Sequence, residues 1–382
     1  MKGKVFILTV LIGASIFFHG CWNMMDLEKK TFIMMMGIDA LPEGQQDKIK
    51  VTLTMPVPRQ LVGAEGGGGP RPETPQQILQ STGNTVYGTI RQITNRLSRQ
   101  LYFEHMTAIV IGEEAAKGGL DRFLDVFQRN KDFLRMAKLY ICEGKAEDVL
   151  KMETEMEPLV VTYINQIVHF NSSRSLRAIN YSIGKVITEL HETNGNSLVM
   201  RIRPEKKEAV VAGSAVIKNW KLVGWLSDRE TRGILWMLKE INRISVETSI
   251  ELQTPQKGLV VLDLVNFTNK TKAKIQDGMP VFYINMRGEA RIVEKEERII
   301  KKEENLERYE KPIEQAITKE INNALQKVQD EYRVDVVNFG EHLRKYHPDY
   351  WETVKEKWDL MFPHVKVVLN VDVKIRRQGI FK

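Results

Sequence analysis

The spacing of apolar residues along this chain changes between two periods, one typical of β-strands and one typical of α-helices. Apolar or alternating runs of strand length stand at residues 31–40, 48–58, 101–112 and 137–144. Apolar residues at helical spacing predict helices at residues 76–100, 120–129 and 145–152. The first of these helices has its apolar stripe at Leu79, Val86, Ile90, Ile93 and Leu97. The predicted order in this part of the chain is β-β-α-β-α-β-α.

A polar segment at residues 192–208 predicts a boundary between two regions, because the glycine and proline within it disfavour regular structure. We therefore expect a leader at residues 1–20, an N-terminal α+β region at residues 21–195 that forms one or two subdomains, and a C-terminal α+β domain at residues 205–382. The predicted fold class is α+β with two or three subdomains, each a mostly antiparallel or mixed β-sheet packed with helices.

The second region repeats the mixture of elements. Two strand-like runs flank residues 218–221, which predicts a hairpin, and Ser227 and Glu230 have the spacing of a capping box that begins the next helix. Further strands are predicted at residues 243–252, 258–267, 280–294 and 365–379. A long helix is predicted at residues 304–332, and its apolar face consists of Ile313, Ile317, Ile321, Leu325 and Val328.

Residues 1–20 have the anatomy of an export signal. The chain begins with the positively charged sequence MKGK, and Val5 to Phe18 form an apolar run that contains no charge. A transmembrane helix needs about 20 apolar residues, so this run is too short to span a bilayer comfortably. We therefore expect residues 1–20 to be a signal peptide and the chain to be exported.

Gly20 and Cys21 resemble the end of a bacterial lipoprotein signal. In such signals the chain is cut between these two positions, and the cysteine carries a diacylglyceryl thioether and an N-linked acyl group such as palmitate. Phe18 and His19 stand where these signals usually have Leu and a small residue. Because two acyl chains hold a protein on a bilayer where one chain is marginal, we interpret Cys21 as a lipid anchor. The alternative is an ordinary signal peptide followed by a fortuitous cysteine.

Composition narrows the classes of partner. The 382 residues are 42% hydrophobic, which allows substantial cores, and 56 Lys and Arg against 49 Asp and Glu give a net charge of +7. Such a modest surplus suits proximity to an anionic membrane surface. No block of Lys and Arg with interleaved aromatic residues is present, so nucleic acid is not expected as a partner. The second cysteine, Cys142, lies in an apolar run and is predicted to be a buried free thiol.

The candidate chemistry in the sequence does not assemble into a catalytic or metal site. His342 and His347 are five residues apart and have no third ligand nearby, so no metal and no cofactor are expected. Glu104 and His105 are predicted on one strand with side chains on opposite faces, and His105 is expected to be half-buried. The sequence G-x-S-x-G of many hydrolases is absent. We therefore do not expect an enzyme.

Tryptophans provide one indication of a surface. Trp220 is predicted at the hairpin tip between Lys218 and Lys221, where contact with a partner or with lipid headgroups is one interpretation. The equally weighted alternative is a tryptophan folded back on its own hairpin. Trp351 and Trp358 have helical spacing and are predicted to lie in the core.

Several ordered motifs together resemble those of the Ger(x)C family, the C subunits of spore germinant receptors. They are GCW with GIDA at residues 37–40, HMTAIVIGEE at 105–114, GSAVIKNWKLVGWLSDRETRGILW at 213–236, and FGEHLRKYHPDYWETVKEKWDLMFP at 339–363 followed by VKIRRQG. The resemblance implies an exported α+β lipoprotein on the outer face of the spore inner membrane, beside a polytopic A subunit and a transporter-like B subunit. It implies neither catalysis nor a germinant site in this chain.

Two hypotheses of function follow. The preferred one is a membrane-anchored, non-enzymatic subunit of a nutrient germinant receptor, needed for receptor assembly or signalling in spore germination. The alternative is a lipid-anchored solute-binding protein that captures a germinant between its domains. An envelope hydrolase is a third and weaker hypothesis.

Overall fold

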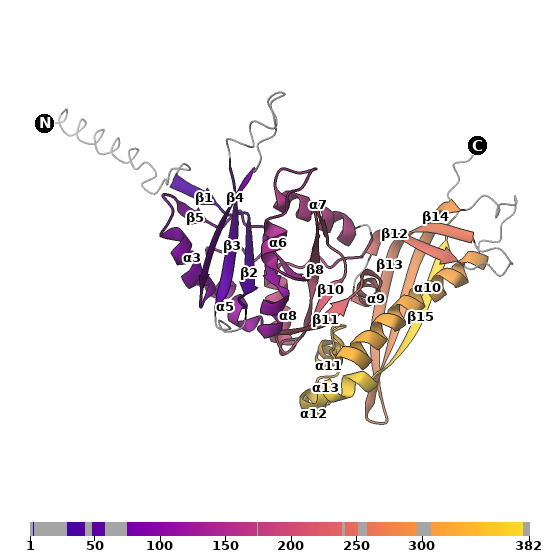
Figure 1. The fold of residues 1–382 in the computed structure, drawn as a ribbon. Coiled ribbons are helices and arrows are strands. Elements are labelled where there is room, and N and C mark those ends of the chain that lie inside the picture. Colours follow the sequence, from indigo (N-terminus) through magenta and orange to yellow (C-terminus); the bar gives the residue numbers. More distant parts are fainter. Residues whose placement is uncertain are drawn as a thin grey trace.

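The computed structural model describes residues 3, 29–42, 48–57, 75–173, 175–238, 241–250, 258–295 and 307–376. The predicted processing site at Gly20 and Cys21, and the rest of the predicted signal peptide apart from Gly3, lie outside the described residues. Within those ranges the chain forms two main sheets that stand side by side, with helices packed on each, and a small two-stranded sheet (Figure 1). The predicted α+β class is confirmed.

The larger sheet has nine strands and a parallel centre. Its order is β11-β10-β8-β7-β6-β2-β3-β4, and β9 pairs with β8 outside this path. Strands β2, β6, β7 and β8 run parallel to one another, whereas both flanks are antiparallel. The strand bounds are β2 (Met35–Ala40), β3 (Ile49–Pro56), β4 (Gln76–Gly83), β6 (Ala108–Gly112), β7 (Lys138–Cys142), β8 (Ser197–Glu205), β9 (Glu208–Val210), β10 (Ser214–Lys218) and β11 (Lys221–Leu226).

Alternate residues of these strands enter two different cores, because successive side chains of a strand point to opposite faces. One core lies between the sheet and the helices α3 (Val86–Thr94), α4 (Glu113–Gly118), α5 (Asp121–Arg129) and α8 (Ile183–Glu192). The other core lies beneath α6 (Ala146–Leu150), α7 (Val160–Ser173) and α9 (Asp228–Leu238). Cys142 is fully buried in this second core as a free cysteine, as predicted.

The smaller sheet has the order β12-β13-β14-β15, with β15 parallel to β14 and the other pairs antiparallel. A long helix, α10, packs along this sheet and continues into a π-helical turn at Lys327–Tyr332. The predicted apolar face of that helix is confirmed, since all five of its residues are buried. The bounds are β12 (Ile241–Ile250), β13 (Gly258–Gln276), β14 (Met279–Lys295), α10 (Glu307–Gln326), α11 (Phe339–Tyr346), α12 (Pro348–Val354), α13 (Trp358–Met361) and β15 (Lys366–Ile375).

The polar segment that we predicted as a boundary contains a strand in the structure. Residues 197–205 form β8, which pairs with β7, β9 and β10 inside the larger sheet. The predicted hairpin is β10 and β11 of this same sheet, so the sheet ends at Leu226. The second core also continues from the larger sheet through α9 into the smaller one. The polar composition of this segment therefore includes the partly exposed carboxyl end of a strand.

Two further elements differ from the prediction. Residues 76–100 do not form one helix: residues 76–83 form the edge strand β4, and α3 begins only after Thr85, whose side chain accepts a hydrogen bond from the Gly88 amide. The predicted strand at residues 101–112 is also two strands, β5 (Gln100–Tyr102) and β6, joined by a turn. Strand β5 pairs with β1 (Lys30–Phe32) in a small parallel sheet.

Candidate functional site

The predicted contact residues at the hairpin tip are placed by local packing. Asn219 and Trp220 both have positive φ, as the tight turn between β10 and β11 requires. Trp220 is half-buried, and its ring lies 5.0 Å from that of His191 in an edge-to-face arrangement. Lys218 donates a hydrogen bond to the carbonyl oxygen of Tyr332 at 3.2 Å. Of the three predicted residues, Lys221 is the one whose side chain is exposed.

Tyr332, at the end of the π-helical turn that follows α10, connects this helix to β11, the edge strand of the larger sheet. Its hydroxyl accepts a hydrogen bond from the backbone amide of Trp225 at 3.1 Å and donates one to the carbonyl oxygen of the same residue at 3.0 Å. The ring lies against Gly224, where a side-chain carbon would come within 2.3 Å of it. Part of the open edge of β11 is therefore covered by this tyrosine.

A buried ion pair joins the same two parts of the molecule between α9 and α10. The side chains of Arg232 and Glu320 are 5% and 19% exposed, and the guanidinium binds the carboxylate through two nitrogens, one at 2.9 Å. The indole nitrogen of Trp236 donates to the same carboxylate at 3.2 Å. The helices approach closely because α9 has glycine at residue 233, where a side-chain carbon would lie 2.6 Å from the Cβ of Ala324. These contacts form a fixed junction between the two sheets.

Asp39, in the motif GIDA, has a structural role. Its carboxylate accepts hydrogen bonds from the backbone amides of Ala146 at 2.7 Å and Glu147 at 2.9 Å, at the start of α6. Burial raises the pKa of this carboxyl above its ordinary value, although the two backbone hydrogen bonds lower it. The motif thus connects the end of β2 to a helix more than one hundred residues later.

Asp335 plays a similar part before α11. It is buried and accepts hydrogen bonds from three backbone amides, the shortest being that of Gly340 at 2.7 Å, and from the indole nitrogen of Trp358 at 2.9 Å. Burial raises the pKa of Asp335, whereas these hydrogen bonds oppose the rise. The ring of Trp351 lies 5.8 Å from that of Trp358, which is buried as predicted. The motif at residues 339–363 therefore contributes a helix cap and its packing.

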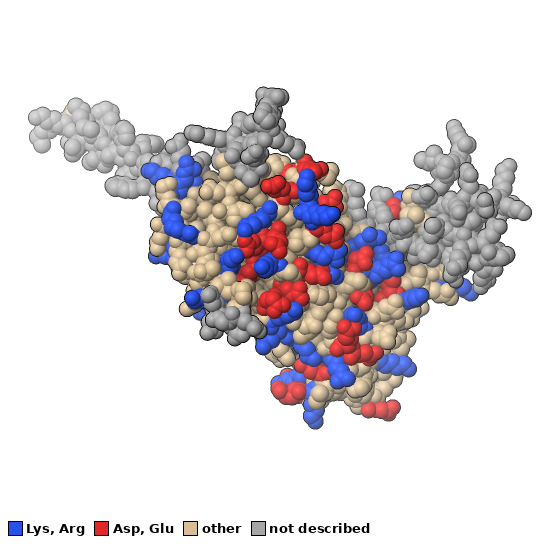
Figure 2. Space-filling view, in the orientation of Figure 1, with Lys and Arg blue, Asp and Glu red and all other residues tan. Residues whose placement is uncertain are grey.

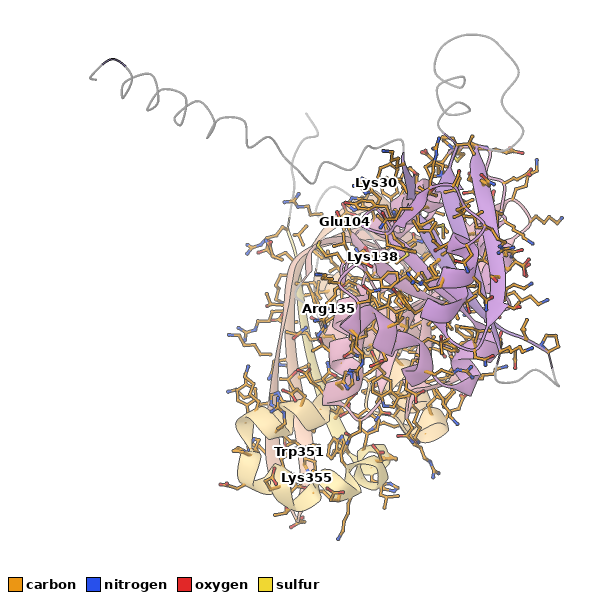
Figure 3. The ribbon with its side chains drawn as sticks, turned by 90° about the vertical axis from the view of Figure 1, so that its left-hand side faces the viewer. Lys30, Glu104, Arg135, Lys138, Trp351 and Lys355 are labelled. Carbon is orange, nitrogen blue, oxygen red and sulfur yellow. The ribbon has the colours of Figure 1, made fainter. Side chains whose placement is uncertain are left out.

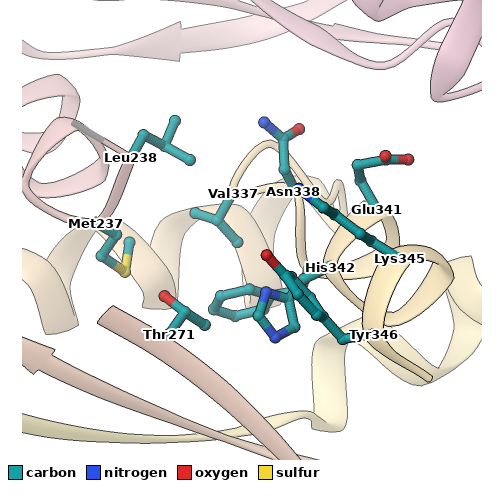
Figure 4. Close-up of a pocket in the computed structure, with 10 residues that line it drawn as sticks. Met237, Leu238, Thr271, Val337, Asn338, Glu341, His342, Lys345 and Tyr346 are labelled. Atoms are coloured by element: carbon teal, nitrogen blue, oxygen red, sulfur yellow. The ribbon is translucent and has the colours of Figure 1, made fainter. Parts of the chain in front are cut away.

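A pocket of about 230 Å³ opens between the end of α9, β13 and α11 (Figure 4). The His342 ring lies in it, 4.6 Å from the Tyr346 ring and 5.8 Å from the Phe282 ring. Burial, together with the neighbouring His347 and Lys345, lowers the pKa of His342 below its ordinary value. The pocket is lined by Met237, Leu238, Thr271, Val337, Asn338, Phe339, Glu341, His342, Lys345 and Tyr346.

The other residues considered for chemistry are separated. Glu104 and His105 lie on a turn and not on a strand, and the expectation that His105 is half-buried was wrong, because its side chain is exposed. In the part of the chain that the structure describes, no three His, Cys, Asp or Glu side chains group as a metal site, and no helix is long and apolar enough to cross a membrane. Lys and Arg are interspersed with Asp and Glu over the face drawn in Figure 2. This mixture is unlike the single-sign patch of a nucleic-acid surface.

The two joined sheets and the capped helices define a two-sheet α+β protein, and comparison identifies its family. The family model "Spore germination protein N-terminal domain" matches residues 23–204, and the model "Spore germination B3/GerAC like, C-terminal" matches residues 212–379. The chain belongs to this family of spore germination proteins, the one that its motifs resemble.

Individual relatives extend over nearly the whole chain. Spore germination protein KC of Bacillus subtilis is 25% identical, and the alignment covers 100% of this chain and 97% of the relative. Spore germination protein B3 of Bacillus subtilis is also 25% identical, with 94% of each chain covered. The crystal structure of the GerBC protein has the same fold, with a TM-score of 0.58 at 22% identity over 90% of this chain and 97% of that one.

Sequence reasoning missed the residues that fix the junction and the caps. Tyr332 and Glu320 were counted only as members of a long amphipathic helix, and nothing in a single sequence pairs them with Trp225 and Arg232. Asp335 stands five residues before Gly340, a longer spacing than the capping signals of helix starts. The capping box of Ser227 and Glu230 was predicted correctly, with its two reciprocal hydrogen bonds at 3.3 and 2.7 Å.

Proposed function

We propose that the chain is a lipid-anchored, non-enzymatic subunit of a nutrient germinant receptor on the outer face of the spore inner membrane. The observation that carries this proposal is Cys21, which stands three positions after the apolar run of residues 5–18 in a chain whose family is that of spore germination proteins. Its partners would be the polytopic A subunit, the B subunit and the bilayer itself.

The proposal is supported by the distance between the anchor and the fold. Eight residues separate Cys21 from Lys30, the first residue of β1. At about 3.3–3.6 Å per residue, this segment keeps β1 within roughly 30 Å of the lipidated cysteine. A subunit held so close to the bilayer is well placed to contact polytopic partners from one side.

Mass spectrometry tests the proposal. The protein is purified through a C-terminal tag from detergent-solubilised spore membranes, and its N-terminal peptide and the co-purifying proteins are identified. We expect an acylated Cys21 together with polytopic subunits. An unmodified N-terminus with no partner would contradict the proposal.

Germination of variant spores provides the functional arm of the test. We expect Cys21→Ala to reduce the nutrient response, because the chain would no longer be retained at the membrane. Cys142→Ala is the matched control, since that cysteine is buried in the core and carries no lipid. A normal response of Cys21→Ala spores at unchanged receptor levels would show that the anchor is dispensable.

The alternative of a solute-binding protein has one specific observation in its favour, the pocket around His342. Its volume of about 230 Å³ lies below the usual range of roughly 300–1,000 Å³ for ligand pockets. Calorimetry with candidate nutrients decides between the two functions. Sub-millimolar binding that is lost in Tyr346→Ala would favour the alternative.

A further inference from the structure

A loop at residues 130–138, which connects α5 to the first residue of β7, combines exposed apolar side chains with basic ones. Met136 is 81% exposed and Leu134 is 43% exposed. Arg135 is exposed between them. Lys131 and Lys138 stand on either side of the trio, and the acidic residue of the loop is Asp132. Large apolar side chains that are exposed together with cations are typical of a surface that binds a partner or a membrane.

The loop is held firmly although its tip is exposed. Phe133 is buried, with its ring 4.8 Å from that of Phe103 and 5.0 Å from that of Phe127. The carbonyl oxygen of Arg135 accepts a hydrogen bond from the Gly184 amide at 3.0 Å, and that of Ala137 accepts one from the Ile183 amide at 2.7 Å. Leu134 and Met136 are therefore presented outward by a fixed backbone.

This loop lies at the same end of the larger sheet as β1, namely the end where the parallel strands begin. Met35, Ala108 and Lys138 are in register at the amino ends of the parallel strands β2, β6 and β7. Neighbouring strands are about 4.8 Å apart, so β7 begins roughly 10 Å from the start of β2. Lys30, with its amino group 4.2 Å from the centre of the Tyr102 ring, is close to that end. Figure 3 shows Lys30, Glu104, Lys138 and Arg135 on the side of the molecule that faces the viewer, so three of these four charged residues are basic.

We infer that the loop at residues 130–138 rests on the anionic surface of the bilayer, with Leu134 and Met136 as its apolar contacts and Arg135 among the lipid headgroups. This inference rests on the proposed anchor at Cys21, because the short segment before Lys30 keeps this end of the sheet near the membrane. Positive side chains close to the surface are attracted to anionic lipids, and buried apolar area adds to that attraction.

A vesicle experiment tests the loop separately from the lipid. The mature chain carrying Cys21→Ser is mixed with vesicles of phosphatidylcholine alone or with phosphatidylglycerol, and the bound fraction is measured by sedimentation. We expect binding to the anionic vesicles only, falling about tenfold in Met136→Ser, since full burial of a methionine changes an equilibrium constant by that order. Arg135→Glu should reduce binding at least about fivefold.

The chain offers matched controls for both changes. Met156 is 83% exposed but lies among Glu153, Glu155 and Glu157, so Met156→Ser should leave the binding unchanged. Lys357→Glu reverses an exposed charge between α12 and α13 and should likewise have no effect. An equal loss of binding in these controls would overturn the inference.

A second measurement tests whether the loop lies at the membrane surface, and it does not depend on how tightly the untethered chain binds vesicles. The Cys21→Ser chain is tethered through an N-terminal hexahistidine to nickel-chelating lipids in anionic vesicles, and a polarity-sensitive fluorophore is attached at Met136→Cys or at Met156→Cys. We expect a blue shift at position 136 only. The absence of a blue shift at position 136 would overturn the membrane contact. That contact would also be overturned if Met136→Ser bound vesicles as well as the unchanged chain but no longer co-purified with the polytopic proteins. The proposed anchor is tested separately, by the mass of the N-terminal Cys21 peptide of the unchanged chain from spore membranes.

Discussion

Removal of the Glu320 carboxylate should weaken the junction between the two sheets more than any exposed ion pair could. The change Glu320→Ala leaves the guanidinium of Arg232 in a site where it is 5% exposed, and it removes the acceptor of the Trp236 indole. Breaking a buried pair by removing one partner costs about 3–5 kcal/mol, because the remaining charge stays buried without compensation. Glu320 is itself 19% exposed, so water can reach the site and the lower end of that range applies.

We therefore expect Glu320→Ala to lower the free energy of unfolding by about 3 kcal/mol, out of the 5–15 kcal/mol typical of native proteins. For a chain of this length, that loss corresponds to a fall in the melting temperature of about 4 °C. The double change Arg232→Met with Glu320→Leu removes both charges and should return the stability to within about 1 kcal/mol of the unchanged protein.

Urea denaturation of the Cys21→Ser chain, followed by tryptophan fluorescence and circular dichroism, measures these differences. The matched control is Asp125→Ala in the exposed Arg129–Asp125 pair, whose side chains are 80% and 58% exposed and whose loss should cost under about 0.5 kcal/mol. A loss of stability in Glu320→Ala no greater than that in Asp125→Ala would refute the role of the buried ion pair. A double variant no more stable than Glu320→Ala would refute it as well.

Three further changes test other contacts. Tyr332→Phe should lower the free energy of unfolding by about 1–2 kcal/mol in urea, because two backbone groups of β11 lose their partner, and an unchanged midpoint would contradict this. Asp335→Ala leaves four donors unpaired and should cost about 3 kcal/mol by the same measurement, whereas a cost under 1 kcal/mol would exclude its role as a cap. Two lysines lower the pKa of Glu147 from 4.5 to about 2, so the stability that this carboxylate contributes is present above pH 4.5 and is lost as the pH falls towards 2. Glu147→Gln should make the melting temperature depend less on pH between 4.5 and 2. The same pH dependence in the variant and in the unchanged protein would refute this role of Glu147.

Elements buried on one face could be predicted from their periodicity, and strands buried on both faces, such as β7, from their continuous apolar run. The helix at residues 307–326 shows its apolar stripe plainly, since a single face of it meets the smaller sheet. Strand β4 carries mostly glutamine, serine and threonine at the edge of the larger sheet, so its sequence lacks the apolar run that would distinguish it from a helix. Strand β8 was missed because its polar carboxyl end resembles a linker, while its other half is buried between β7 and β10.

The candidate site was less predictable than the fold, because its contacts join residues far apart in the chain. The hairpin tip was predicted from local turn chemistry, and whether Trp220 folds back depends on His191, which comes from another element. Met136 and Leu134 gave no signal, because nothing local shows that residues 130–138 face outward while Phe133 faces the core. Local pattern fixes the tight turn and the capping box of Ser227, whereas exposure depends on packing by distant elements.

The motifs that connect this chain to its family act mainly within the fold. Asp39 caps α6, the segment at residues 213–236 supplies the hairpin and Arg232, and the segment at residues 339–363 supplies the aromatic packing around Asp335. Side chains occupied in this way are not available to a ligand or a partner. Other residues of these motifs remain exposed, among them Lys221, Tyr346 and Leu360, and the outward loop at residues 130–138 is an exposed surface outside the motifs. A resemblance carried by structural residues such as Asp39 and Asp335 is thus strong evidence for the fold, and the exposed residues are the ones that remain free to make contacts with other molecules.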